Sequence, residues 1–483
     1  MGTQKWCQPR KLILPLTIGV IFILALGPLT DPDLFWHLSN GKLIWQTKRV
    51  PHQDPFAFTM AGKEWTCHEW LTEVVVYGLY SGLGQAALIV GGGALVAASF
   101  ALTAARCRTS PYVAAFATLL AALASMPSWG VRPQMVSLLM SSLSLLILER
   151  RWPVWTLVPL AGLWANLHGG FATGMAIVGA QVLGNAIDSL RGNDRVSKRK
   201  RARQLMMSAL GMILATLANP YGIKLLIYPF QTLASGAMRE YIVEWFSPDF
   251  HKLAFQPLAM LLLALILSLA LSRRGPSATS LILLLGTIYA ALNSVRHVPL
   301  LAVVSAPVLA QQMSNIKPWH GIFKTRHCSM LSAPCPPRLA VCVSVVAIAV
   351  LVGGSAYKIY MVTRQNRAAQ MERYPVQALQ FMRQAELAGN LFNRYSWGGF
   401  LIWQGEKVFI DGRADLYGDE FFKLYVDVYK GRVAPYQVFQ QHGIRRVVIE
   451  PDCALATLLE QSASWDKVYK DNLAVVFLKT GAG

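Results

Sequence analysis

The chain has 483 residues, of which 54% are hydrophobic and only 14% are charged, and its mean hydropathy is +0.39. Ordinary soluble domains carry about 25% charged residues, so this composition excludes a soluble enzyme and predicts a membrane protein. A net charge of +20 would suggest nucleic-acid binding in a soluble protein. Here the basic residues gather in short loops between apolar segments, as the positive-inside bias predicts, and no nucleic acid is expected as a partner.

Long apolar runs dominate the chain from residue 11 to about residue 360. Most are close to the length that crosses a hydrocarbon core of about 30 Å as a helix. We therefore predict a polytopic α-helical membrane domain over residues 1–360, with about eleven transmembrane helices. The expected spans are 11–29, 84–104, 112–127, 133–149, 153–167, 170–188, 205–218, 256–272, 278–293, 297–313 and 339–357.

The basic loops predict the orientation of these spans. ARCR at 105–108, ERRW at 149–152, RGNDRVSKRKRAR at 191–203 and SRRG at 272–275 all fall on one side, which we expect to be cytoplasmic together with the N-terminus. An odd number of spans then puts the tail on the outer side. Residues 361–483 predict a small soluble α/β domain with strands in KVFIDGR (407–413), RRVVIEP (445–451) and LAVVFLK (473–479). Helices are expected in PVQALQFMRQAEL (375–387) and PYQVFQQHG (435–443).

The first outer loop, residues 30–69, is unusually rich in acidic and histidine residues. Asp31 precedes Pro32 and is suited to cap a helix, while Asp33 and His37 lie one turn apart on that helix. The pattern predicts an interfacial helix whose apolar side contacts lipid and whose Asp33–His37 pair faces a cavity, or else a solvated helix face. Asp33 is the strongest candidate for a catalytic carboxylate.

The end of the same loop adds His68 and Glu69. Thr66 to Glu69 fits a capping box, in which Glu69 bonds back to the Thr66 amide, so His68 is the better functional candidate of the two. A carboxylate–histidine cluster also suits a divalent metal ion, the only cofactor considered. Its ligands would be Asp31, Asp33, His37 and His68.

Further polar residues stand at other outer tips, and a helix bundle can bring such tips to one cavity. A positive charge there suits a phosphate, although each residue can equally be an interface anchor or a satisfied tip residue. These substrate-binding candidates are Arg132, His168, Glu244, Arg296 and His297. In the tail, Trp397 can stack on a sugar ring while Asp411, Arg413 and Asp415 bond hydroxyls, unless these segments are simply core strands.

Several motifs together resemble the GT-C superfamily of membrane glycosyltransferases, and more closely a bacterial group described only as glycosyltransferases. They are DPDLFWHL, DPFAFT, HEWL, NLHGG, NPYG, EWFSPDF, RHVPL, NRYSWGGFLIW and FIDGRADLYG. The resemblance implies a polyprenyl-phosphate-linked sugar donor and an acidic residue of the first outer loop as general base or metal ligand, with Asp33 the best match. It also implies a bacterial inner membrane and a periplasmic tail domain.

The resulting hypothesis is transfer of a sugar from a polyprenyl phosphate to a hydroxyl of a glycan, lipid or protein, with Asp33 as general base and inversion at the anomeric carbon. This chain lacks a WWDYG-type motif and an Asp-Glu pair, which disfavours oligosaccharide transfer to Asn and protein O-mannosylation. The competing interpretations are a polysaccharide polymerase or ligase, a transporter or flippase for a lipid-linked glycan, and a scaffold.

Overall fold

The computed structural model describes residues 9–190, 195–316 and 337–481, and its contacts separate two compact units. Unit 1 comprises Met1–Gly27, Ile89–Gly222 and Val243–Met361. Unit 2 comprises Pro28–Leu88, Ile223–Ile242 and Val362–Gly483. The tail therefore shares a unit with the first outer loop. Residues 191–194 of the predicted basic loop lie outside the described residues.

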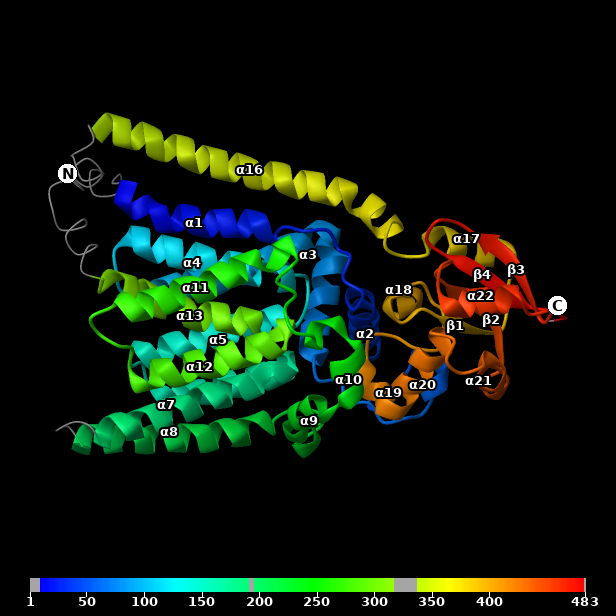
Figure 1. The fold of residues 1–483 in the computed structure, drawn as a ribbon, viewed down its shortest axis with the longest axis horizontal. Helices are drawn as coiled ribbons and strands as arrows, with labels where there is room; N and C mark the ends of the chain where they lie inside the picture. The colour runs from blue at the N-terminus through cyan, green and yellow to red at the C-terminus, as the bar shows by residue number, and fades with distance from the viewer. Residues whose placement is uncertain (1–8, 191–194, 317–336, 482–483) are drawn as a thin grey trace. The chain divides into compact units, whose positions relative to one another are not determined.

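Unit 1 is built from helices that run side by side (Figure 1). Alanines on α4 are almost fully buried, among them Ala114, Ala117 and Ala121, and α4 packs along α13 at this face. Small residues let two helices approach closely, which is how helices associate where no water drives them together. Its helices are α1 (Pro9–Ala25), α4 (Pro111–Ser125), α5 (Gln134–Glu149), α6 (Leu157–Leu167), α7 (Ala172–Leu190), α8 (Arg195–Thr216), α11 (Gln256–Leu271), α12 (Ala278–Asn293) and α13 (Val298–Ser314). Two longer helices, α3 (Trp70–Arg106) and α16 (Pro337–Met371), continue from one unit into the other.

Every predicted span coincides with a helix of the structure. Within the described ranges, five helices are long and apolar enough to cross a membrane, and four shorter apolar helices accompany them. This confirms a mostly helical multi-pass membrane protein, while the figure of eleven crossings stays a prediction. Helix α3 joins the predicted amphipathic piece to the span that follows, with a kink at Gly84, whose φ is 74°.

Unit 2 contains a four-stranded sheet in the order β1-β2-β4-β3, in which only β1 and β2 are parallel. The strands are β1 (Asn390–Asn393), β2 (Ile444–Ile449), β3 (Trp465–Lys470) and β4 (Val475–Lys479). Its helices are α2 (Leu34–Thr47), α9 (Ile223–Ala234), α10 (Gly236–Tyr241), α17 (Val376–Gln384), α18 (Gly398–Trp403), α19 (Ala414–Tyr417), α20 (Asp419–Tyr429), α21 (Pro435–Gln441) and α22 (Ala454–Glu460).

The predicted strands at 445–451 and 473–479 and both predicted tail helices are confirmed by β2, β4, α17 and α21. The strand predicted at 407–413 is wrong, because Val408 forms only isolated bridges and the chain then turns at Asp411. The preceding SWGGFLIW segment is helical, and a Cβ at Gly398 or Gly399 would overlap a neighbouring carbonyl oxygen. These two glycines let α18 pack directly against backbone.

Helix α2 is not the lipid-facing helix that its sequence predicted. Leu34, Phe35 and Leu38 are buried within unit 2, and α18 packs against α2. Phe35 forms edge-to-face ring contacts with Tyr374 and Phe400, both from the tail. This part of the apolar side is therefore covered by protein, whereas Trp45 near the end of α2 is 47% exposed.

Candidate functional site

Gly41 brings helices α2 and α3 into contact. A Cβ at this position would overlap the backbone carbonyl of Glu73, so only glycine allows this approach. His37, one turn earlier on α2, and Asn40, the residue before Gly41, then lie against the first turn of α3. This arrangement builds a buried polar cluster within unit 2.

Glu73 is at the centre of this cluster and is fully buried. His37 Nδ1 lies 2.9 Å from Glu73 Oε1. Asn40 Nδ2 donates to Glu73 Oε2 over 2.5 Å, and the Cys67 thiol donates to the same oxygen over 3.0 Å. On its other side, His37 Nε2 lies 3.5 Å from Glu69 Oε2. Buried carboxylates are stable only with such partners.

The electrostatics favour a proton on His37. Burial lowers the pKa of His37, but the hydrogen bond to Glu73 and the charges of Glu69, Glu73 and Asp33 outweigh it and leave the pKa raised. Burial, together with Glu73, raises the pKa of the Cys67 thiol well above its usual value. Cys67 therefore serves as a neutral donor.

His68 connects this cluster to a cavity. Its Nε2 lies 3.3 Å from Glu69 Oε1, and its ring stacks on Tyr228 with centroids 4.1 Å apart. Burial lowers the pKa of His68, but Glu69 and Asp415 more than compensate and raise it. His68 was predicted as a candidate, and the structure brings it beside Glu69 as well.

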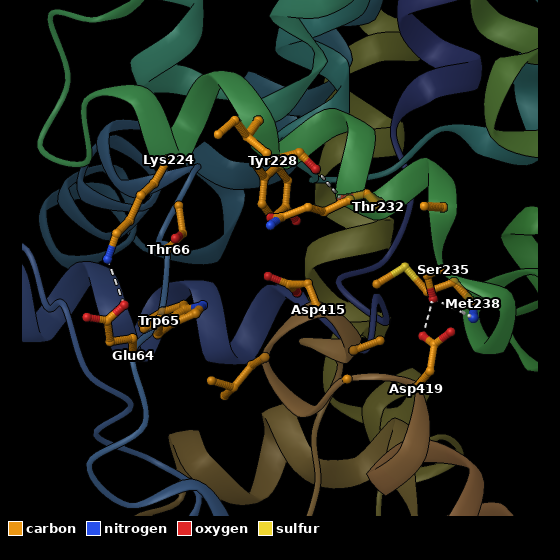
Figure 2. A pocket seen from close by; sticks show the side chains of 16 residues that line it. Glu64, Trp65, Thr66, Lys224, Tyr228, Thr232, Ser235, Met238, Asp415 and Asp419 are labelled. Carbon is orange, nitrogen blue, oxygen red and sulfur yellow. Dashed lines mark hydrogen bonds and ion pairs between the residues drawn. The ribbon is translucent and has the colours of Figure 1, made fainter.

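The cavity has a volume of about 710 Å³ and lies entirely in unit 2. Figure 2 shows Asp415 in its middle, facing Tyr228, with the Lys224–Glu64 ion pair of 2.6 Å at one end. At the other end Asp419 accepts a hydrogen bond of 2.6 Å from Ser235. Lys224 and Glu64 thus bond to each other and Asp419 bonds to Ser235, whereas Asp415 presents a carboxyl to the cavity.

Burial raises the pKa of Asp415, against the opposing charge of His68. A carboxyl group with a raised pKa in a cavity is a candidate acid or base. Asp415 belongs to the FIDGRADLYG motif, and its role had been considered only as a partner for sugar hydroxyls.

Asp31 and Asp33 lie outside the His37–Glu73 cluster. The Asp31 carboxylate accepts the Asp33 amide over 2.9 Å in the turn that precedes α2, whereas the N-cap residue of α2 is Asp33 and not the predicted Asp31. Asp33 Oδ1 accepts Trp36 Nε1 over 3.2 Å and occupies space that a side chain at Gly412 would fill. Asp33 is half-buried and does not line the cavity.

Three of the four tail residues predicted to bind a sugar, Trp397, Asp411 and Arg413, are buried. Trp397 is 1% exposed and donates through Nε1 to the Arg373 carbonyl. Arg413 is 2% exposed and forms two bonds of 2.7 and 2.6 Å with the Asp411 carboxylate. Its third bond, of 2.6 Å, goes to Asp54. These side chains have no surface for a ligand, so the structure does not support their predicted sugar contacts.

The candidates from the other outer tips lie in unit 1 and have local partners there. Arg132 forms an ion pair with Glu244, and Arg296 lies over the Trp245 ring, 5.4 Å from its centroid. His297 is half-buried, and its ring lies edge-on to the Trp245 ring with the centroids 6.4 Å apart.

His168 also has local partners in unit 1. Its Nδ1 lies 2.6 Å from Ser137 Oγ and accepts the Gly170 amide over 2.9 Å. These bonds hold the turn between α6 and α7.

A divalent metal ion fits a different set of residues from the predicted one. Among the described residues, the His, Cys, Asp and Glu side chains that converge as potential ligands are His37, Glu69 and Glu73, with ligand atoms within 4.8 Å of one another. One imidazole and two carboxylates are suitable donors for Zn²⁺ or Mn²⁺. Asp31, Asp33 and His68 are not part of this group. Glu73 was missed, although a glutamate inside an apolar helical run was a signal for it.

The chain has the fold of the GT-C membrane glycosyltransferases, as the sequence resemblance predicted. The structure of ArnT from Cupriavidus metallidurans bound to undecaprenyl phosphate matches with a TM-score of 0.50 and 15% identity over 98% of both chains. The Archaeoglobus fulgidus oligosaccharyltransferase AglB, in complex with an inhibitory peptide and a dolichol-phosphate, matches with a TM-score of 0.57 and 12% identity. That match covers 90% of this chain and 68% of AglB. No protein-family model matches the sequence, and neither does any curated protein.

Proposed function

We propose that this chain is an integral-membrane glycosyltransferase that transfers a sugar from a polyprenyl phosphate to an acceptor hydroxyl on the outer side of a bacterial inner membrane. The observation that carries the proposal is the full-length likeness to a structure that binds undecaprenyl phosphate. The dolichol-phosphate in the AglB structure supports the same class of donor. The acceptor belongs to a cell-envelope glycan, lipid or protein.

The unit 2 cavity supports the proposal by its chemistry. Its volume of about 710 Å³ lies within the range of about 300–1,000 Å³ for small-ligand pockets. Tyr228, which is half-buried, provides an aromatic ring for the C–H side of a sugar, and Asp415 accepts hydrogen bonds from hydroxyls. A cavity with an aromatic ring and carboxylates along its wall suits a sugar.

In the proposed reaction Asp415 is the general base. The acceptor O–H gives its proton to the carboxylate while its oxygen forms a bond to the anomeric carbon. The bond from that carbon to the lipid phosphate breaks, and the phosphate leaves with the electron pair, which inverts the anomeric configuration. A base with a raised pKa removes this proton more readily, and such catalysis contributes about 10²–10⁴-fold.

Asp33 remains the competing candidate for the base. The sequence resemblance favours it, and its position is fixed by Trp36. Asp415 has the stronger case, because it lines the cavity. Arg132 and Arg296, which both lie in unit 1, stay candidates for binding a phosphate there, since a guanidinium matches phosphate geometry. For Arg132 this requires exchange of the Glu244 carboxylate for the phosphate.

The test uses the purified full chain in lipid nanodiscs with a panel of labelled polyprenyl-phosphate sugars, scoring hydrolysis and transfer. Asp415→Asn is expected to lower turnover by about 10²–10⁴-fold. The exposed Asp452, changed to Asn, is the matched control and should retain wild-type turnover. Wild-type turnover should also fall as the pH drops through the raised pKa of Asp415, because the base must be ionised.

Two outcomes would change these assignments. Full activity of Asp415→Asn combined with loss of activity in Asp33→Asn would move the base to Asp33. Absence of hydrolysis and transfer with every donor would contradict glycosyl transfer and favour a transporter or flippase for a lipid-linked glycan.

A divalent cation is a further proposal for the His37–Glu69–Glu73 group. Such an ion, when bound, would supply positive charge that stabilises a phosphate leaving group. The chain itself would supply the ligands, which are two buried carboxylates and one imidazole. Without a metal ion, a proton on His37 offsets part of the negative charge of these carboxylates. Metal analysis of the purified wild type and of Glu73→Gln tests this, and equal metal content in the two proteins would contradict it.

A further inference from the structure

A second cavity, of about 690 Å³, lies within unit 1 among the helix ends that the basic loops predict to be cytoplasmic. Five basic side chains line it, against only two acidic ones, Glu149 and Asp188. The basic side chains come from the end of α3, the end of α5 and the start of α8. They are Arg106, Arg108, Arg151, Lys200 and Arg201.

Two of these arginines build the wall of the cavity. Arg106 is buried and donates to the Glu149 carboxylate over 3.0 and 2.7 Å, and its third bond of 2.6 Å reaches the Val303 carbonyl. Arg108 donates to the Glu149 backbone carbonyl over 3.0 Å. The charge of Glu149 is therefore already compensated by Arg106.

The other three cations face the cavity without such compensation. In the part of the chain that the structure describes, the side chains of Arg151, Lys200 and Arg201 have no ion-pair partner. Burial and the nearby Arg151 charge lower the pKa of Arg201, so the two guanidinium groups repel each other. An anion between them would remove this repulsion.

The start of helix α12 contributes a second type of anion-binding group. Ser277 caps this 16-residue helix by accepting the Ser280 amide over 3.2 Å, and Thr279 and Ser280 also line the cavity. Gly184 of α7 allows this approach, because a Cβ there would overlap Thr279. A helix N-terminus carries partial positive charge and amide donors that bind phosphate.

We propose that this cavity binds a phosphate-bearing anion, of the kind that an anionic phospholipid carries in its headgroup. Basic cavities between membrane helices on the cytoplasmic side bind such headgroups. The shared chemistry is a phosphate oxygen between Arg151, Arg201 and the hydroxyls of α12. This site is independent of the glycosyl transfer proposed for unit 2.

The experiment measures the Tm of the full chain in neutral detergent micelles with added phosphatidylglycerol, phosphatidylcholine or inorganic phosphate. Phosphatidylglycerol is expected to raise the Tm by several degrees, and phosphatidylcholine should have a much smaller effect because its headgroup has no net charge. Stabilisation by phosphatidylglycerol alone supports a lipid headgroup as the ligand. Stabilisation by inorganic phosphate as well supports phosphate itself.

The double variant Arg151→Gln/Arg201→Gln should lose this stabilisation and, with the repulsion removed, have a higher Tm than the wild type without ligand. Arg273→Gln/Arg274→Gln is the matched control, because it removes the same charge from an exposed loop that does not line the cavity. If the first variant fails to fold, Lys200→Gln should weaken the stabilisation in its place. Equal stabilisation of both double variants, or equal loss in both, would overturn the proposal.

Discussion

Arg413→Ala is expected to destabilise unit 2 and not merely to weaken substrate binding. In the folded chain the guanidinium is enclosed, since Asp411 accepts two of its hydrogen bonds and Asp54 a third. It also lies over the Trp65 ring, 4.6 Å from the centroid. Removing the cation leaves two carboxylates, 0% and 7% exposed, without their counter-charge.

Breaking a buried ion pair by removing one partner costs about 3–5 kcal/mol, because the remaining charge stays buried. For a unit of about 200 residues, each kcal/mol lowers the Tm by about 2–4 °C, so the expected loss is about 10 °C. The measurement is thermal unfolding of the purified chain, read by tryptophan fluorescence. Arg413→Lys should be nearly as unstable, since an ammonium group cannot make the paired bonds to Asp411.

A matched triple variant separates charge from packing. Arg413→Met combined with Asp411→Asn and Asp54→Asn removes all three charges and should recover much of the lost Tm, since apolar replacement of a buried ion group is often neutral. A wild-type Tm in Arg413→Ala, with a raised KM for the sugar donor, would refute this reasoning and restore Arg413 as a substrate-binding residue.

Two further predictions concern the contact between α2 and α3. Because the folded pKa of His37 is raised, the stabilisation from its proton is complete below the unfolded pKa of about 6.5 and is lost as the pH rises through the folded value. The wild-type Tm should therefore fall over this pH range. In Glu73→Gln, which lacks the main group that raises the pKa of His37, the fall in Tm should be smaller. Identical pH profiles of Tm in the two proteins would contradict the pairing of His37 with Glu73. Gly41→Ala should cost about 1–3 kcal/mol by forcing the helices apart, whereas Gly82→Ala on α3, with open space around its Cβ, should be neutral or stabilising. Equal Tm values for the two alanine variants would show that the close approach at Gly41 has no energetic role.

The sequence predicted those features that depend on local pattern. Each apolar run predicted to span the membrane falls on a helix, and alternating β-branched segments located β2 and β4 in the tail. These features are set by interactions within about one helical turn or one strand.

Tertiary contacts decided the features that the sequence missed. KVFIDGR has the composition of a buried strand, yet Asp411 and Arg413 are drawn into an ion group with Asp54, more than 350 residues earlier in the chain. Helix α2 has the pattern of an interfacial helix, but α18 covers its apolar side. An apolar helix face predicts that the face is buried, but it does not predict whether lipid or protein covers it, since both are apolar.

The difference between local sequence pattern and tertiary contacts also explains why the sequence favours Asp33 as the base whereas the cavity favours Asp415. Asp33 and His37 are one helical turn apart in the sequence, which predicts that their side chains pair. In the folded chain His37 instead pairs with Glu69 and Glu73, which come from the end of the loop and the start of α3. The carboxyl that lines the cavity comes from the tail, where burial raises its pKa and the His68 charge opposes that rise. A raised pKa of this kind requires burial, and burial of a loop carboxyl is produced by segments distant in sequence. Acid–base chemistry in this fold is therefore expected where the first outer loop and the tail pack together, and not within either segment alone.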